Sequence, residues 1–144
     1  MSSSPNQQGI SYRLLSDPPE EELVSLYKHA GWIGPRDTPD RIHRLIRGSF
    51  LFCCAFDEAG RMIGSMRALS DGVSDAYLLD LVVEPTYRRQ GIGREILHRL
   101  SAHLRSLGVD WIVLAGAPGT EPFYRATGFR IMDEYLPYHL PEGE

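Results

Sequence analysis

The segment 76–116 constrains the fold most, because it contains a strand, a turn, a helix and a second strand in succession. The stretch "AYLLDLVV" is nearly continuous in apolar residues, which is typical of a strand buried on both faces. Pro85 ends it, since proline has no amide hydrogen to donate to a ladder. Apolar residues then recur at helical spacing until Gly108, and "DWIVLAG" follows as the next strand. The segment therefore predicts a fold that mixes α and β elements.

The remaining segments extend this pattern in both directions. "ISYRLL" alternates like a strand, "SFLFCCAF" and "RMIGSMRAL" are joined by a short loop as in a hairpin, and "FRIMDEY" predicts a final strand. Three further helices are predicted, with Ser16 or Asp17 capping the first, Thr38 or Asp37 the second and Thr120 the last. The order β-α-α-β-β-β-α-β-α-β predicts a mixed α/β (α+β) sheet with helices on both faces.

Length and charge limit the classes of function. The 144 residues suffice for one domain, placed at residues 10–144 after a disordered N-terminal tail at residues 1–9. A net charge of −4 and a pI near 5.7 argue against nucleic-acid and membrane-surface partners, which usually require a broadly basic face. No apolar run approaches the roughly 18 residues of a membrane span, and the N-terminus lacks the regions of a signal peptide. We therefore expect a cytoplasmic protein that holds any anionic ligand at one local site.

Neither the cysteines nor the histidines predict a metal or redox centre. Cys53 and Cys54 are adjacent, so we expect them on opposite faces of a strand. A vicinal redox pair is the alternative, but the apolar flanks offer nothing to lower a thiol pKa. The five histidines have no spacing typical of ligands, so no metal is expected.

The sequence "RRQGIG", residues 88–93, is the strongest functional signal, and we call it the glycine turn. It lies between a predicted strand and a predicted helix, and the first amides of a helix attract anions. Gly91 and Gly93 would allow phosphate oxygens to approach the backbone, and Arg88, Arg89 and Arg94 add positive charge in an otherwise acidic protein. The turn therefore predicts a phosphate site.

Two familiar nucleotide motifs do not fit the glycine turn. A P-loop requires a lysine and a hydroxyl residue after its second glycine, and neither follows Gly93. A dinucleotide fold requires G-x-G-x-x-G after the first strand, whereas this turn lies past the middle of the chain and has Ile96 in the third position. A tight turn that needs glycine only for its geometry stays open as the alternative.

The glycine turn and one further motif resemble the GNAT N-acetyltransferases. The pyrophosphate motif of that family, Q/R-x-x-G-x-G/A, matches residues 88–93, and its aromatic helix followed by glycine and phenylalanine matches "EPFYRATGF". The resemblance covers Ile10 to about Tyr138. It implies a GNAT fold whose sheet is splayed between its fourth and fifth strands, "AYLLDLVV" and "DWIVLAG", with acetyl-CoA lying between them.

The resemblance also implies which residues bind acetyl-CoA. Backbone groups of the fourth strand would pair with the pantetheine amides, and the amides of the glycine turn would hold the pyrophosphate. The cofactor-binding residues implied are Leu81, Val82, Val83, Arg88, Arg89, Gln90, Gly91, Ile92, Gly93, Arg94 and Phe123. One departure is at Ala115, Gly116 and Ala117, where relatives commonly carry Asn or Asp, so that contact would have to come from the backbone.

Direct acetyl transfer in a ternary complex needs a neutral amine, a polarised thioester carbonyl and a proton for the thiolate. The amide of Val83 is the first candidate to polarise the carbonyl. Tyr124 matches the tyrosine that resembling enzymes place beside the sulfur as general acid, and its alternative role is packing of its own helix against the sheet.

Asp80 is the second catalytic candidate, because it interrupts an apolar strand. An unpaired carboxylate there would cost several kcal/mol, so it needs a partner or a purpose. One interpretation pairs it structurally with an arginine such as Arg67. The other makes it the general base or the anchor for the acceptor amine.

The acceptor is less constrained than the donor. The motifs also resemble the branch that contains plastid and cyanobacterial serotonin N-acetyltransferases, which favours an aromatic amine. At a more general level, we expect the acceptor to be a small molecule that carries a primary amine. Alternatives are acetylation of protein N-termini or lysines, a non-catalytic acyl-CoA-sensing module, and a phosphate or nucleic-acid binder. Relatives often dimerise, which makes "MDEYLPYHL" a candidate homodimer surface. Aromatic residues that could line the acceptor site are Tyr27, Trp32, Phe50, Tyr77 and Tyr138.

Overall fold

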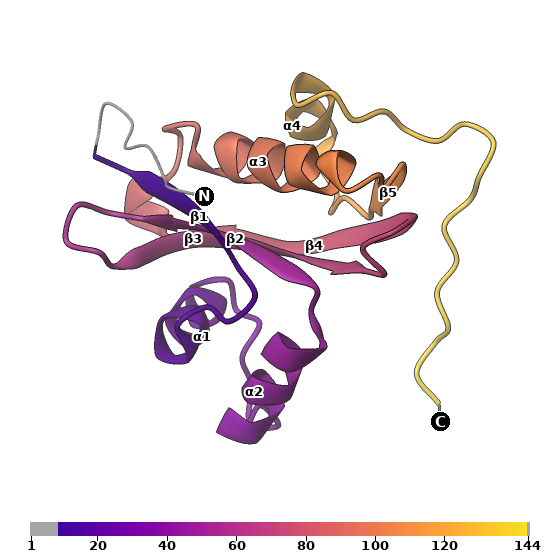
Figure 1. Ribbon diagram of the computed structural model, residues 1–144. Coiled ribbons are helices and arrows are strands. Elements are labelled where there is room, and N and C mark those ends of the chain that lie inside the picture. Colours follow the sequence, from indigo (N-terminus) through magenta and orange to yellow (C-terminus); the bar gives the residue numbers. More distant parts are fainter. Residues whose placement is uncertain (1–8, 144) are drawn as a thin grey trace. The chain divides into compact units, whose positions relative to one another are not determined.

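In the computed structural model, which describes residues 9–143, a five-stranded mixed sheet organises the first of two compact units, Met1–Leu114. The second unit is Ala115–Glu144, and each unit is described by itself. The strands lie in chain order, antiparallel except for the last, parallel pair (Figure 1). They are β1 Ser11–Leu15, β2 Leu51–Phe56, β3 Met62–Ser70, β4 Asp75–Val83 and β5 Trp111–Leu114.

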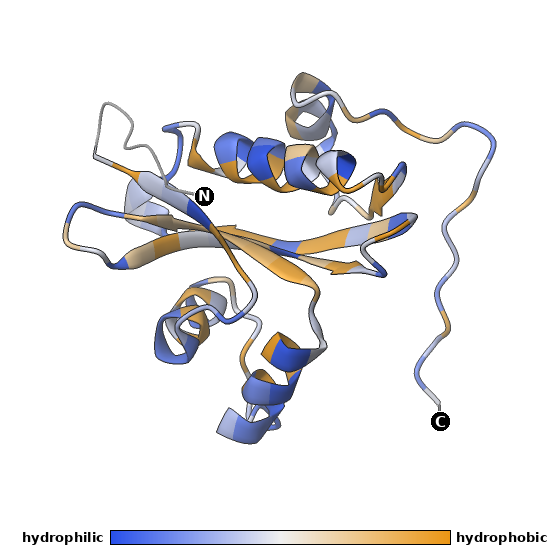
Figure 2. Cartoon of the chain, viewed as in Figure 1, coloured by the Kyte–Doolittle hydropathy of each residue, from blue (hydrophilic) through white to orange (hydrophobic). Residues whose placement is uncertain are grey.

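Helices cover both faces of this sheet, as predicted. Helices α1 (Glu20–His29) and α2 (Pro39–Gly48) lie on one face, and α3 (Ile92–Ser106) lies on the other (Figure 1). Figure 2 shows that α3 turns its apolar side toward the sheet. The side chains on that side are all at most 1% exposed: Ile92, Ile96, Leu97, Leu100 and Leu104.

The two cysteines belong to opposite faces of β2. Cys54 packs in the core under α1 and α2, whereas Cys53 lines a cavity beside α3, which confirms the predicted alternation. Both are free thiols, and burial raises the pKa of each to about 12. At neutral pH they are therefore protonated core residues.

The N-terminal caps were predicted correctly for one helix and wrongly for another. Thr38 caps α2, accepting a 3.2 Å hydrogen bond from the amide of Arg41. Neither Ser16 nor Asp17 caps α1, because that helix begins only at Glu20, with Pro19 in the cap position. Residues that precede a proline avoid the helical conformation, so the two consecutive prolines delay the helix.

The second unit contains α4 (Glu121–Ala126), with Thr120 in the predicted cap position, although the Thr120 hydroxyl donates to the carbonyl of Ala117. The final strand predicted over 129–135 is not formed: the described residues contain no strand after β5. A strand needs a neighbour for its ladder, and within 115–143 there is no other strand to supply one. The fold class and the predicted order of elements hold through α4.

The tail predicted at residues 1–9 lies, except for Gly9, outside the described residues. Across residues 9–143, no helix combines the length and the apolar character needed to cross a membrane.

Close packing of α3 on β3 at Gly64 gives a test of this core. A Cβ atom at Gly64 would lie 2.9 Å from Cδ1 of Ile96 and 3.4 Å from the carbonyl oxygen of Val82. Gly64→Val is expected to lower the free energy of unfolding by about 1–3 kcal/mol through overpacking, as measured by urea denaturation. Gly48→Val is the matched control, because nothing lies within 4 Å of its Cβ position. Equal losses in the two variants would contradict the close packing.

Candidate active site

Strand β4 extends beyond the end of β5 where the sequence analysis placed the cofactor, and we call this side of β4 the open side. Their parallel pairing covers only Asp75–Leu78 with Trp111–Leu114, while β4 continues to Val83. Because β5 is paired along its whole length, the end of β4 has no parallel neighbour among the described residues, and the splay between the two strands stays a prediction. The expectation that the whole strand is buried on both faces was wrong, because Tyr77 is 39% exposed and the residues from Leu79 to Leu81 are only half-buried.

Backbone direction along the end of β4 follows from its ladder with β3. The amide of Glu84 donates to the carbonyl of Ile63, so Val83, opposite Gly64, directs its amide and carbonyl away from β3. By the same alternation Leu81 faces the open side and Val82 faces β3. Of the three predicted strand residues, Leu81 and Val83 therefore offer backbone groups to a ligand on the open side.

A bulge in β4 sets the position of Asp80. Leu79 pairs with Arg67 and Val82 pairs with Ser65, so two residues of β4, Asp80 and Leu81, face one residue of β3. Asp80 itself has a φ of 61°, a left-handed conformation that costs a residue with a side chain about 1–2 kcal/mol. The surrounding network must hold it there.

The predicted partner of Asp80 is present. Nε of Arg67 donates to Oδ2 of Asp80 at 2.7 Å, and the two side chains are 13% and 26% exposed. The hydroxyl of Tyr27 approaches the same oxygen at 3.5 Å. Burial, and next the charge of Asp80, raises the pKa of Tyr27 well above its usual value, so Tyr27 stays protonated as a donor. The ion pair is confirmed, and a catalytic role for Asp80 stays a prediction.

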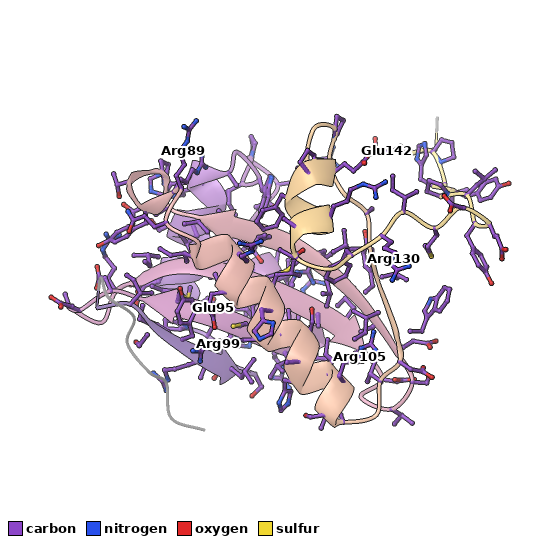
Figure 3. The ribbon with its side chains drawn as sticks, turned by 90° about the horizontal axis from the view of Figure 1, so that it is seen from above. Arg89, Glu95, Arg99, Arg105, Arg130 and Glu142 are labelled. Carbon is purple, nitrogen blue, oxygen red and sulfur yellow. The ribbon has the colours of Figure 1, made fainter. Side chains whose placement is uncertain are left out.

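The glycine turn has the backbone shape expected of an anion site. Arg89 and Gly91 have φ angles of 63° and 80°, and Gly91 is the N-cap of α3. Alternation of left-handed and right-handed residues turns successive amides toward one side, and the first helical turn adds amides without intrahelical acceptors. Figure 3 shows Arg89 beyond the N-terminal end of α3. Nε of Arg88 donates to the carbonyl of Val83 at 3.3 Å, which links the turn to the end of β4.

The acidic neighbours of the glycine turn are paired with arginines outside it. Glu84, before the turn, accepts from Nη1 of Arg61 at 2.5 Å. Glu95, after it, accepts from Nε of Arg99 at 2.7 Å, one turn further along α3 (Figure 3). Arg88 and Arg89 are exposed, and so is Arg94 next to the turn, which places three cationic side chains at this surface.

In the second unit, Tyr124 is held by aromatic contacts. Its ring makes edge contacts with the rings of Phe123 and Phe129, at centroid distances of 5.1 and 6.1 Å. A Cβ atom at Gly116 would lie 3.4 Å from the Tyr124 ring, so the small residue at that position suits this packing. Burial raises the pKa of Tyr124, which keeps its proton available at neutral pH. Packing and proton donation are thus compatible roles for this residue.

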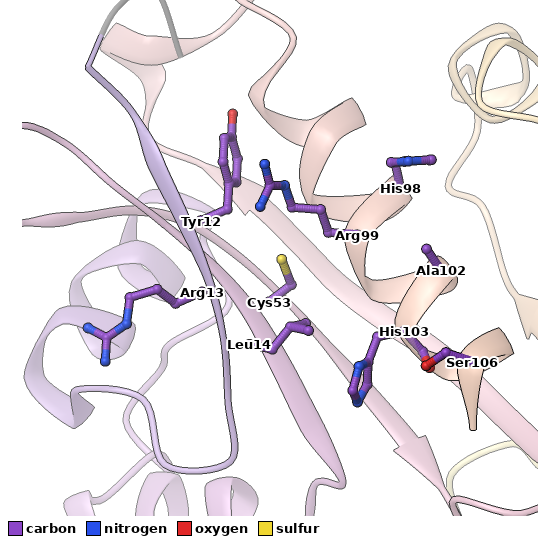
Figure 4. Close-up of a pocket in the computed structure, with 9 residues that line it drawn as sticks. All are labelled: Tyr12, Arg13, Leu14, Cys53, His98, Arg99, Ala102, His103 and Ser106. Carbon is purple, nitrogen blue, oxygen red and sulfur yellow. The ribbon is translucent and has the colours of Figure 1, made fainter. Parts of the chain in front are cut away.

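A cavity that the sequence did not predict lies between β1 and α3, with a volume of about 270 Å³ (Figure 4). Tyr12, Leu14 and Cys53 line one side, and the α3 residues His98, Arg99, Ala102, His103 and Ser106 line the other. Arg13 points away from it (Figure 4), over the ring of Phe56 at 5.6 Å. The cavity follows the later turns of α3, away from the glycine turn at its start. Within residues 9–143, no three His, Cys, Asp or Glu side chains group as metal ligands.

Comparison with known proteins decides the family. Residues 11–129 match the acetyltransferase (GNAT) family. The chain belongs to the GNAT family. The family resemblance inferred from the glycine turn and "EPFYRATGF" is thereby confirmed.

One curated relative of this GNAT chain is serotonin N-acetyltransferase 2, chloroplastic, of Oryza sativa subsp. japonica. It is 40% identical over 98 residues, which cover 66% of this chain and 49% of the rice protein. The GNAT chain thus spans about half the length of the curated relatives that it matches.

Solved structures support the GNAT fold. A GNAT family acetyltransferase from Streptococcus pneumoniae superposes with a TM-score of 0.79 at 24% identity, covering 94% of this chain and 99% of that one. A predicted acetyltransferase from Clostridium acetobutylicum, solved with acetyl-CoA, has a TM-score of 0.71 at 22% identity and covers 90% and 96%. At these identities the likeness concerns the fold alone.

Proposed function

We propose that this GNAT chain moves the acetyl group of acetyl-CoA to the primary amine of a small molecule by direct attack in a ternary complex. The observation that carries the proposal is the continuity between the open end of β4 and the glycine turn. The end of β4 can pair with the amides of the pantetheine arm, and the glycine turn can hold the pyrophosphate. An extended CoA thioester needs both in this order. The acetyl-CoA bound by the clostridial structural neighbour supports this choice of donor.

The donor site uses mainly backbone groups. The backbone groups of Leu81 and the carbonyl of Val83 would pair with the pantetheine amides from the open side of β4, which leaves the amide of Val83 for the thioester, and the amides of residues 90–94 would hold the pyrophosphate. Arg88 and Arg89 would add charge at the phosphates. Phe123 is assigned to the donor side by the family resemblance.

The chemistry needs three proton transfers and one bond exchange. Asp80 accepts a proton from the acceptor ammonium, directly or through water, which frees the nitrogen lone pair to attack the thioester carbon. The amide of Val83 donates to the carbonyl oxygen, where negative charge develops. The C–N bond forms and the C–S bond breaks, Tyr124, assigned by the family resemblance, donates its proton to the leaving thiolate, and the second proton of the amine nitrogen passes through water to the Tyr124 phenolate.

An aromatic primary amine is the acceptor class that we favour. The rice relative is named for serotonin. In this chain Trp32 is 44% exposed and packs edge-on against Tyr27 at a centroid distance of 5.4 Å, and the Tyr27 hydroxyl reaches Asp80. The exposed ring of Trp32 and the carboxylate of Asp80 thus both contact the side chain of Tyr27. This arrangement suits a molecule that carries both an aromatic ring and an ammonium group.

A screen of acceptors tests the proposed function. Wild-type protein is mixed with acetyl-CoA and with serotonin, alkylamines, a lysine peptide and a free N-terminal peptide, and release of the CoA thiol is followed. Arylalkylamines are expected to give the highest kcat/KM. Thiol release only with the peptides would show that the acceptor is a protein and not a small molecule. Binding of acetyl-CoA without release for any amine would favour the acyl-CoA-sensing alternative.

Tyr124→Phe is expected to lower kcat about tenfold at saturating acetyl-CoA. A CoA thiolate is a fairly good leaving group, since thiols ionise near pH 8.5, so loss of the acid costs less than is usual for general acids. Steady-state kinetics checks this. The matched control is Tyr135→Phe, an exposed tyrosine of the same unit. Full kcat in Tyr124→Phe would leave Tyr124 with a packing role only.

Two further expectations belong to the proposal. We propose a homodimer that covers the apolar side chains of the C-terminal segment, including Leu136 and Leu140, which are 73% and 95% exposed. Light scattering on the protein as it elutes from a size-exclusion column tests this, and a monomer at micromolar concentration would contradict it.

A cytoplasmic location is proposed on the sequence features alone, and imaging of a tagged full-length protein tests it.

A further inference from the structure

The two oxygens of the Asp80 carboxylate have different surroundings. The hydrogen bonds from Arg67 and Tyr27 both end on Oδ2, from β3 on one side and α1 on the other. In the part of the chain that the structure describes, no donor is assigned to Oδ1. The side chain is 26% exposed, so a molecule arriving at this face can reach the carboxylate.

Both donors are themselves held in place. Nη1 of Arg67 donates to the hydroxyl of Ser49 at 3.2 Å, and that hydroxyl donates to the carbonyl of Leu45 at 2.8 Å. The guanidinium is thereby fixed at two nitrogens and is mostly buried. Tyr27 is 3% exposed within the core under α1 and α2. Neither donor can follow the carboxylate if it rotates.

The bulge explains why such a support is needed. Asp80 keeps a left-handed backbone conformation inside a strand, where a more relaxed conformation would carry the side chain elsewhere. Two fixed donors on one oxygen define the rotation of the carboxylate about its last bond. They direct Oδ1 away from the protein donors.

We infer that Arg67 and Tyr27 are positioning residues for the acceptor amine: they clamp Oδ2 of Asp80 so that Oδ1 is presented to the ammonium group and takes its proton. This inference rests on the proposed function. Tyr27 is 3% exposed and the Arg67 side chain 13% exposed, so we expect their effect on the amine to be exerted through Asp80, and Tyr27 not to line the acceptor site directly. The clamp consists of Arg67 and Tyr27, and Ser49 holds Arg67 in place.

Kinetics of clamp variants test the inference with the best amine of the acceptor screen. Arg67→Ala is expected to lower kcat/KM for the amine about tenfold, and Tyr27→Phe about threefold, with KM for acetyl-CoA unchanged. Arg67→Lys should recover the activity only in part, because lysine supplies charge without the planar fork that reaches Asp80 and Ser49 together. Arg44→Ala, which removes an exposed ion pair with Asp40, is the matched control.

If folded Arg67→Lys and Tyr27→Phe retain amine kcat/KM within about twofold while Asp80→Asn loses it, the clamp does not position the carboxylate. Melting temperatures identify variants that are merely unstable, and where Arg67→Ala does not fold the two conservative variants decide.

Failure of the proposed function gives a different signature. If wild type acetylates no amine, that function falls. The clamp is then judged by a double-mutant cycle of Arg67→Ala and Asp80→Ala in urea unfolding. Additive losses overturn the clamp, and non-additive losses support only the part of it by which Arg67 holds the Asp80 carboxylate.

Discussion

Asp80→Asn is expected to lower kcat/KM for the acceptor amine by about 100-fold or more, the size of effect usual for loss of a general base. The side-chain amide of asparagine has nearly the shape of the carboxylate and can still accept a hydrogen bond from Nε of Arg67. The variant is therefore expected to keep the bulge and the position of the Arg67 side chain. It cannot take a proton from an ammonium group. The KM for acetyl-CoA is expected to stay at its wild-type value, because the glycine turn is untouched.

Asp75→Asn is the control for this variant. Asp75 is an exposed carboxylate at the other end of β4, paired in register with Trp111. Its replacement is expected to leave kcat/KM unchanged. A fully active Asp80→Asn protein would show that Asp80 has only the structural role that its pairing with Arg67 provides.

Gly91→Val is expected to weaken acetyl-CoA binding about 30-fold or more in isothermal titration. The residue has a φ of 80°, and a β-branched side chain in that region is strained by more than the 1–2 kcal/mol typical of a left-handed residue. Space is not the limit, since nothing lies within 4 Å of its Cβ position. The backbone would relax away from the left-handed region and redirect the first amides of α3, which removes the cradle.

Gly108→Val separates this local effect from general strain. Gly108 follows the other end of α3, has a φ of 96° and likewise has nothing within 4 Å of its Cβ position. The two variants should lose similar stability, but only Gly91→Val should lose affinity for acetyl-CoA. Equal affinities in both would show that the glycine turn does not hold the donor.

The parts of the fold with a strong local signal could be predicted from sequence. The helix from Ile92 to Ser106 has continuous apolar spacing and lies between two glycines with positive φ. The pairing of Asp80 with Arg67 was one of two interpretations of a carboxylate in an apolar strand, and it follows from the cost of an unpaired buried charge. The splay expected between β4 and β5 rests on the family resemblance and stays a prediction, since no residue pattern encodes where pairing stops.

The rest depends on tertiary context. Tyr27 and Asp80 are 53 residues apart, and nothing near either one indicates the contact. The left-handed conformation of Asp80 arises from the register of two strands, which a sequence does not display. The apolar alternation after α4 predicted a strand, but alternation alone cannot supply the partner that a ladder requires.

The most direct test of acetyl transfer follows an isotopically labelled acetyl group. Wild-type protein is incubated with acetyl-CoA labelled in the acetyl carbonyl and with serotonin or the best amine of the screen, and the products are resolved by mass spectrometry. The account predicts one labelled N-acetyl amine for each CoA thiol released, with Asp80→Asn and Gly91→Val both greatly reduced. Thiol release without a labelled amide, or equal yields from all three proteins, would contradict it.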